Sequence, residues 1–540
     1  MFENSLVPVV RRAWFADILV GAALTSGAAA YLALTVPWTR PPYEDAAMLL
    51  RYAAHVAAGH GLVWNIGDPP LDGATDLLFT LAVAATMHLG VSVEAAARLL
   101  GVGAHLLTVF LVFIVPRRLY GAPVIVCALG PLFLALGPAR SYIGTEFGTT
   151  FFAAWVAIAW AVALIAAETG SRRAEWALPV LAVVLGVARP DGAILGASFL
   201  LAVAMYRGGA DGRRFFTRTA LTFAAMGGAY FAGRWRYFGH PLPNPFYIKG
   251  GYIFFDSLRA SAGNLVRLAG PFFPLLALGL HSRETTRRLV LVSVPVGIFI
   301  SAWILLSNAM NFNMRFQYAV LPMLLMSWPG AILPLLPQWS GLWRTLAVRV
   351  RIAVMVAAAM TAVLVGVRQH FRSTGGVPLD SLRDVGQRLA AYQSRDYTIV
   401  VSEAGLLPFY SGWRAIDAWG LNDAEIAQTG GVTNGYLDRS HPAVISFHAY
   451  FSPAAPPAPA VGPGGQNLQG WGAMTMTLYN YANARGYRLA ACFGLVPDDT
   501  QFFYVRPDLP DAERIIDAIR STPYAFSGRP AIDFAQRIAP

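Results

Sequence analysis

The sequence predicts a polytopic α-helical membrane protein that carries a C-terminal α/β domain. Hydrophobic residues make up 56% of the 540 residues and charged residues only 13%, and the mean hydropathy is +0.49. This composition is typical of chains whose helices lie in lipid. Apolar runs of helical length also recur up to residue 367 and then stop. Finally, arginine clusters occupy every second connection between these runs.

The first apolar run, residues 15–36, is too long for the core of a signal peptide, and no small-residue cleavage site follows it. We therefore expect a helix that stays in the membrane. Further runs of helical length bring the prediction to about eleven transmembrane helices. These runs are residues 98–115, 120–137, 149–168, 176–187, 192–206, 216–233, 268–281, 289–306, 316–337 and 352–367.

Arginine clusters orient the predicted helices, because cytoplasmic connections carry an excess of basic residues. The clusters are Arg11/Arg12, Arg117/Arg118, Arg172/Arg173, Arg207–Arg218, Arg283–Arg288 and Arg344–Arg351. The alternate connections then face the outside of a plasma (inner) membrane, and the first of these outer loops is residues 37–97. The apolar stretch 74–89 would break this alternation if it crossed, so we interpret it as an interfacial or re-entrant helix on the outer face.

After residue 367 the chain changes to short β-like runs separated by turns. The runs are Thr398–Val401, Ala443–Phe447 and Gln501–Val505. We therefore divide the chain into a transmembrane domain at 1–367 and a soluble α/β domain at 368–540, which the parity of the spans places outside. The net charge of +11 follows largely from the cytoplasmic arginines, so no nucleic-acid partner is expected.

An acidic pair, Glu44 and Asp45, follows the first apolar run. A carboxylate so close to lipid is costly, which favours a role in chemistry over one in packing. The residues after the pair have the spacing of a short helix along the membrane, whose N-terminus stabilises an ionised carboxylate. Such a group can act as a general base toward a sugar hydroxyl. The alternatives are a helix cap or an ion pair with Arg51.

Cations gather on the same predicted face. Lys249 is the only lysine among 41 basic residues, and its compact ammonium suits a phosphate oxygen, although one lysine could also survive by chance. Arg189 and Arg315 lie in outer connections, where arginine can hold a lipid-linked phosphate or act as an interfacial anchor. The remaining candidates, for substrate binding, are His240 and Asn244 beside Lys249, Glu146 in another outer connection, and Glu403 after a predicted strand.

Five segments of the predicted outer face carry a recognisable pattern, each occurring once along the chain. They are Glu44-Asp45 followed by Arg51, residues 59–65 continuing to Asp72–Thr75, Arg189–Gly192, Leu242–Lys249, and Glu403–Asp423. Together they resemble the GT-C superfamily of polyprenyl-phosphate-dependent glycosyltransferases, most closely the terminal arabinofuranosyltransferases of mycobacterial cell walls. The chain departs from the usual pattern by having Glu44 in place of Asp, Asp72 in place of Glu, Phe79 in place of Trp and Glu403 in place of Asp.

The resemblance implies a GT-C fold, a polyprenyl-phosphate-linked sugar as donor and a cell-envelope glycan or glycolipid as acceptor, with arabinofuranose as the leading candidate sugar. We predict Asp45 as the base with Glu44 assisting. The predicted cations around the departing phosphate are Arg51, Arg189, Lys249 and Arg315. No cofactor is expected, because the lipid phosphate is already a competent leaving group, and a divalent metal is left open.

Two other functions compete with a transferase. A transporter or flippase for lipid-linked glycans could bind phosphate with the same cations. Transporters usually place charges near the midplane and contain inverted repeats, whereas this chain concentrates them at one face and shows no repeat. An assembly scaffold with a degenerate site is the third reading. Substitution of Asp45 separates these functions, because only a transferase depends on that carboxylate.

Overall fold

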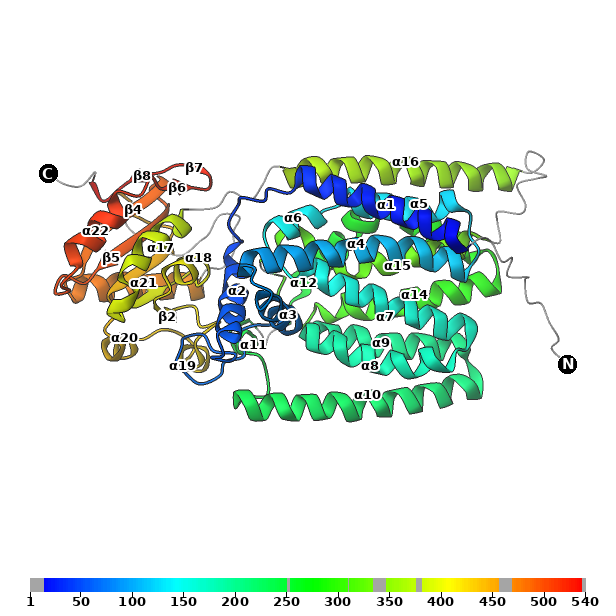
Figure 1. Ribbon diagram of the computed structural model, residues 1–540, viewed down its shortest axis with the longest axis horizontal. Helices are drawn as coiled ribbons and strands as arrows, with labels where there is room; N and C mark the ends of the chain where they lie inside the picture. Colours follow the sequence, from blue (N-terminus) through cyan, green and yellow to red (C-terminus); the bar gives the residue numbers. More distant parts are fainter. Residues whose placement is uncertain are drawn as a thin grey trace.

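The computed structural model describes residues 14–249, 253–308, 310–333, 346–374, 381–455 and 469–536. A bundle of long helices forms one end of the described molecule, and an α/β unit forms the other (Figure 1). The predicted basic residues Arg11, Arg12 and Arg344, and the end of the predicted run 316–337, lie outside the described residues.

A helix lies in each of the eleven predicted apolar runs. The helices of the bundle are α1 (Trp14–Thr35), α4 (Val93–Leu119), α5 (Val124–Ala135), α7 (Thr149–Thr169), α8 (Arg172–Ala188), α9 (Pro190–Arg207), α10 (Gly209–Phe238), α12 (Phe255–Ala269), α13 (Phe272–Ala277), α14 (Arg283–Ala302), α15 (Leu321–Ile332) and α16 (Leu346–Thr374). By length and composition, five described segments can cross a membrane, or six if α12 and the helices after it, bent by 87°, form one span. The chain is therefore a polytopic membrane protein, and the number of eleven spans stays a prediction.

The end of the bundle opposite the α/β unit is rich in arginine. The connections after α4, α7 and α9 all lie at this end (Figure 1). Ion pairs between helices neutralise part of the charge, and they are Asp17–Arg117 at 2.8 Å, Glu175–Arg207 at 2.7 Å and Glu168–Arg288 at 2.8 Å. The basic connections predicted from alternate loops thus share one end of the molecule.

Two helices of the first loop lie between the bundle and the α/β unit: α2 (Glu44–Ala57) and α3 (Leu77–Met87) (Figure 1). At 1.5 Å per residue, α3 is about 16 Å long, roughly half the thickness of a hydrocarbon core. It is too short to span, in agreement with the prediction for residues 74–89. One face of α2 packs on α3 and α4 through Leu50 and Ala53.

The α/β unit contains a six-stranded sheet in the order β2-β1-β3-β5-β4-β8. Its strands are β1 (Thr398–Val401), β2 (Arg414–Asp417), β3 (Val444–Ala449), β4 (Arg488–Val496), β5 (Asp499–Val505) and β8 (Ile532–Asp533). Three of them confirm the predicted strands. Strands β2, β1 and β3 run parallel, and β3, β5, β4 and β8 are antiparallel neighbours.

Helices cover both faces of this sheet. The helices of the unit are α17 (Leu382–Leu389), α18 (Leu406–Ser411), α19 (Ala424–Thr429), α20 (Asn434–Ser440), α21 (Gln469–Ala484) and α22 (Ala512–Arg520). The core beneath α17, α18 and α22 also contains Ala47, Leu49 and Tyr52 of α2. The first loop and the α/β unit therefore share one hydrophobic core. Because α16 ends at Thr374, the predicted boundary at 367/368 falls inside this helix.

Candidate active site

A cavity of about 110 Å³, the charged cavity, lies where the bundle, the first loop and the α/β unit meet. Its charged lining residues come from four separate segments, and they are Asp45, Asp76, Arg189, Lys249 and Arg315. Phe147, Thr149 and Phe316 also line it from the bundle, and Leu421 and Asn422 from the α/β unit. The structure thus brings four of the predicted site residues together: Asp45, Arg189, Lys249 and Arg315.

Asp45 lies in the first turn of α2, where the helix dipole favours a negative charge. Its Oδ2 accepts a hydrogen bond from Nη2 of Arg315 at 2.7 Å. The Arg315 guanidinium also stacks over the ring of Phe147, 3.9 Å from its centroid. The ion pair and the stacking together fix the orientation of the Asp45 carboxylate.

Arg189 lies at the junction of α8 and α9. Its Nε is 3.1 Å from Asp191 and 3.6 Å from Asp76, and its guanidinium lies over the rings of Phe152 and Phe316. Burial raises the pKa of Asp76, while the charges of the nearby arginines act in the opposite direction. Asp76 is thus a second carboxylate in the lining of the cavity. It lies near Arg189 and Arg315.

Lys249 is the last residue of α11 (Asn244–Lys249) and completes the lining. Asn244 at the start of α11 does not line the cavity; its Nδ2 donates to the carbonyl oxygens of Gly420 at 2.8 Å and Leu421 at 3.0 Å. It anchors Lys249's helix to the α/β unit. The lining holds three cations and two carboxylates, which leaves one positive charge in excess.

Glu44 points away from the charged cavity and binds the α/β unit. Its Oε1 accepts the backbone N–H groups of Gly405 at 2.5 Å and Leu406 at 3.0 Å, at the start of α18. A Cβ at Gly405 would lie 1.9 Å from the carbonyl oxygen of Glu44, so this contact requires glycine. Burial and the charge of nearby Glu403 raise the pKa of Glu44. The predicted residues Glu44 and Glu403 therefore meet each other beside the cavity.

Arg51 is buried at the same interface, away from the charged cavity. Its guanidinium donates to the carbonyl oxygens of Trp64 at 2.9 Å, Pro408 at 2.5 Å and Trp413 at 2.8 Å, and to Asn65 Oδ1 at 3.2 Å. Burial lowers its pKa to about 10. Because these acceptors engage its guanidinium, Arg51 connects the first loop to the α/β unit. It does not line the charged cavity, where it was predicted to bind the donor phosphate.

Two further predicted residues lie elsewhere. Glu146 is 1% exposed and pairs with Arg98 at 2.6 Å, and burial raises its pKa to about 8. His240 lies just after α10, and its Nε2 is 3.2 Å from Nε2 of Gln428 in the α/β unit. It lines a different cavity. Neither side chain lines the charged cavity.

The sequence reasoning missed Asp76, and the signal was present. Asp76 directly precedes the apolar helix α3, so it is a carboxylate close to lipid, like Asp45. Asn422 was missed because its place depends on the α/β unit folding against α2. Among the residues that the structure describes, no three His, Cys, Asp or Glu side chains group as metal ligands would.

A second, apolar cavity of about 340 Å³ adjoins the charged one, and Thr75 lines both. Its walls come mainly from α8 and α10, including Val183, Val187, Phe223 and Phe231. The ion pair of Arg234 with Asp72 also lines it. The apolar cavity between α8 and α10 therefore borders the charged cavity.

One family model matches most of the α/β unit. A family model described as "Domain of unknown function (DUF8728)" matches residues 368–504. No curated protein matches the chain in sequence.

Solved structures share the fold of nearly the whole chain. The crystal structure of ArnT from Cupriavidus metallidurans in the apo state is 14% identical, with a TM-score of 0.55, over 91% of this chain and 98% of ArnT. ArnT bound to undecaprenyl phosphate has the same identity and coverage, with a TM-score of 0.54. Arabinofuranosyltransferase AftD from Mycobacteria is 12% identical, with a TM-score of 0.50, over 92% of this chain and 40% of AftD. These likenesses confirm the predicted GT-C-type fold.

Proposed function

We propose that the chain is an integral-membrane glycosyltransferase that moves a sugar from a polyprenyl-phosphate donor to a cell-envelope glycan or glycolipid. The observation that carries the proposal is the charged cavity, which Asp45 lines together with Arg189, Lys249 and Arg315 where the bundle meets the α/β unit. The GT-C-type fold shared with ArnT and AftD supports the same class of reaction.

The donor phosphate would bind among the three cations, where guanidinium and ammonium groups form charge-assisted hydrogen bonds with its oxygens. The first part of the polyprenyl tail would lie in the adjoining apolar cavity, whose walls are membrane helices. ArnT, of the same fold, binds undecaprenyl phosphate in its crystal structure. A lipid phosphate is therefore the donor headgroup that these two neighbouring cavities fit best.

Asp45 would act as the general base. When the donor phosphate engages Arg315, the carboxylate of Asp45 is released from its ion pair and can accept the proton of the acceptor hydroxyl. The acceptor oxygen bonds to the anomeric carbon as the bond from that carbon to the phosphate oxygen breaks. The cations stabilise the charge that returns to the departing polyprenyl phosphate.

We further propose that the transferred sugar is arabinofuranose and that the reaction takes place at the outer face of the plasma membrane. The arginine-rich end of the bundle supports this orientation by the positive-inside rule, since the charged cavity lies at the opposite end. In the same scheme, residues 1–367 form the transmembrane domain and residues 368–540 the extracytoplasmic domain.

The test is transfer of radiolabelled sugar from synthetic polyprenyl-phospho-arabinofuranose to short glycan acceptors by the purified chain. Asp45→Asn keeps the size of the side chain and should reduce transfer roughly 100-fold or more, the usual contribution of a general base. Asp438→Asn, an exposed acid of the α/β unit, is the matched control and should transfer at the wild-type rate. Lipid movement between leaflets that is indifferent to Asp45→Asn, with no transfer from several lipid-linked sugars, would favour the flippase.

A further inference from the structure

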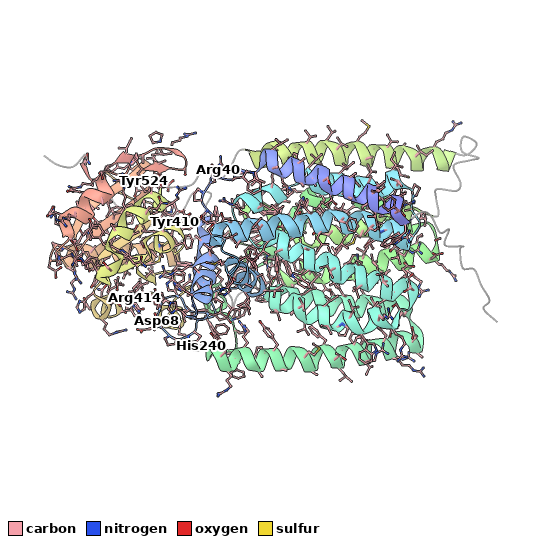
Figure 2. All side chains as sticks on the ribbon, in the orientation of Figure 1. Arg40, Asp68, His240, Tyr410, Arg414 and Tyr524 are labelled. Atoms are coloured by element: carbon pink, nitrogen blue, oxygen red, sulfur yellow. The ribbon has the colours of Figure 1, made fainter. Side chains whose placement is uncertain are left out.

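A third cavity, the polar cleft, lies at the junction of the α/β unit and the bundle and measures about 570 Å³. Three segments distant in sequence build it: residues 64–71 of the first loop, the end of α10, and the α/β unit. Its wall includes Trp64, Asp68, Phe238, His240, Arg414 and Tyr436. Asp68, Arg414 and His240 lie on the same side of the molecule, where the two parts meet (Figure 2).

The lining of the polar cleft has no excess of positive charge, unlike that of the charged cavity. Arg414 Nη2 donates to both carboxylate oxygens of Asp68, at 2.7 and 3.0 Å. Arg439 pairs with Glu425, and the Tyr436 hydroxyl donates to Asp423 at 2.5 Å. The lining thus holds two arginines, Arg414 and Arg439, and two acids, Asp68 and Asp423. A cleft with no excess of positive charge favours a neutral ligand over a phosphate or a carboxylate.

The same wall contains both hydrogen-bonding groups and aromatic side chains. Tyr436 is half-buried and offers its ring to the cleft, while Phe238 and Trp64 in the same wall are buried, at 9% and 3% exposed. Aromatic faces pack on apolar C–H surfaces, while fixed charged and amide groups bond to hydroxyls. Among neutral ligands, this combination suits a saccharide, which presents C–H faces and a rim of hydroxyl groups.

The polar cleft shares a wall with the charged cavity, because Asn422 lines both. Asn422 is 3% exposed and is held by the Tyr52 hydroxyl at 3.1 Å and by Asp417, which accepts its backbone N–H at 2.9 Å and its Nδ2 at 3.0 Å. A fixed residue therefore separates the two spaces. A ligand in the cleft therefore lies on one side of Asn422, with the space that Asp45 lines on the other.

We propose that the polar cleft binds the non-reacting sugar units of a neutral oligosaccharide acceptor, whose terminal hydroxyl reaches the charged cavity. This inference rests on the proposed transferase function and adds the class of acceptor to it. It also assigns His240, predicted as a substrate-binding residue, to the acceptor rather than to the donor.

The test is equilibrium binding of neutral arabinofuranosyl and glucosyl oligosaccharides, from mono- to hexasaccharide, to the purified full-length chain in detergent without donor. Affinity should rise with length. It should fall roughly tenfold, or 1.4 kcal/mol, in Arg414→Gln and in His240→Ala. His240→Ala removes little from the fold, because the ring makes one hydrogen bond, with Gln428 at 3.2 Å, and one edge contact with the ring of Tyr247. The matched control is Arg485→Gln, which removes a somewhat more exposed pair, with Asp438, outside the cleft.

Three results would overturn the inference: no saccharide binding by folded wild type, equal losses in the Arg485→Gln control, or tighter binding of phosphorylated than of neutral sugars. Because the measurement needs no donor and no turnover, it separates this inference from the proposed function. If Arg414→Gln and His240→Ala both transfer sugar at the wild-type rate and with the wild-type acceptor KM, the acceptor site alone is refuted. Saccharide binding in the cleft without transfer from any donor would retain the saccharide site and refute the transferase.

Discussion

Glu44 offers the sharpest separation of a structural role from a catalytic one. Its carboxylate accepts two backbone N–H groups of the α/β unit, from Gly405 and Leu406. Glu44→Ala leaves both donors without this acceptor, at a cost of about 1–3 kcal/mol each when fully buried. Because the site is partly accessible, we expect a loss near the lower end, about 2–3 kcal/mol in total. Glu44→Gln retains an acceptor oxygen and should lose much less.

The pH dependence of stability should follow from the same residue. Burial and the Glu403 charge raise the pKa of Glu44 in the folded chain above its ordinary value of 4.5. The folded state then binds the proton more tightly than the unfolded state, so the stability from this group is complete below pH 4.5 and is lost as pH rises through the folded-state pKa. Glu44→Gln does not titrate and should flatten that decline.

Thermal unfolding of the detergent-solubilised chain at acidic and neutral pH measures both effects, beside the transfer assay. We expect Tm to fall clearly in Glu44→Ala and little in Glu44→Gln, with transfer retained by Glu44→Gln. Glu513→Gln, in an exposed pair with Arg488, is the control. A Glu44→Gln variant that keeps its Tm but loses transfer as fully as Asp45→Asn would refute the structural role, because only the ability to ionise would then have mattered.

Three further substitutions test other contacts. Arg51→Met removes four buried hydrogen bonds and leaves the carbonyl oxygens of Trp64 and Trp413 without this donor, while Asn65 Oδ1 and the Pro408 carbonyl keep other donors; it should lower the free energy of unfolding by about 3 kcal/mol, measured as Tm, without a selective change in donor KM. Asp76→Asn removes one partner of Arg189 and should change donor KM roughly tenfold while Tm stays within a few degrees, because the ion pair is long at 3.6 Å. Gly148→Ala would place a Cβ 2.8 Å from Asp76 Oδ2 and 2.9 Å from Phe79, so transfer should fall while the circular dichroism spectrum is retained.

Much of the helical bundle could be predicted because lipid imposes a simple rule on the chain. A segment that crosses must be long and apolar, so composition alone locates it. The run predicted at 15–36 is α1 at Trp14–Thr35. The run predicted from residue 316 fits less well, since 3₁₀ turns precede α15, which begins at Leu321 with Pro322 in its first turn. Proline favours this position because it has no N–H to leave unpaired there.

The sequence located those residues of the charged cavity that lie in predicted outer connections between membrane helices. It did not show which residues would contact the folded α/β unit. Asp45, Arg189, Lys249 and Arg315 all follow from their place in outer connections. Arg51 stands in the same loop, but its partners Pro408 and Trp413 lie more than 350 residues away in sequence. No local pattern distinguishes an arginine that binds phosphate from one that binds distant carbonyl groups.

The parallel strands explain why the α/β unit takes part in the site at all. The carboxyl ends of β1 and β2 deliver residues 402–406 and 417–423 to one edge of the sheet, as in other open parallel sheets. The first segment binds Glu44, and the second contributes Leu421 and Asn422 to the charged cavity. Since α2 also shares its core with this unit, the position of Asp45 depends on the sheet as much as on the membrane helices. Separating the α/β unit from the bundle would therefore remove the shared wall of the charged cavity and the polar cleft, and not merely an appended domain.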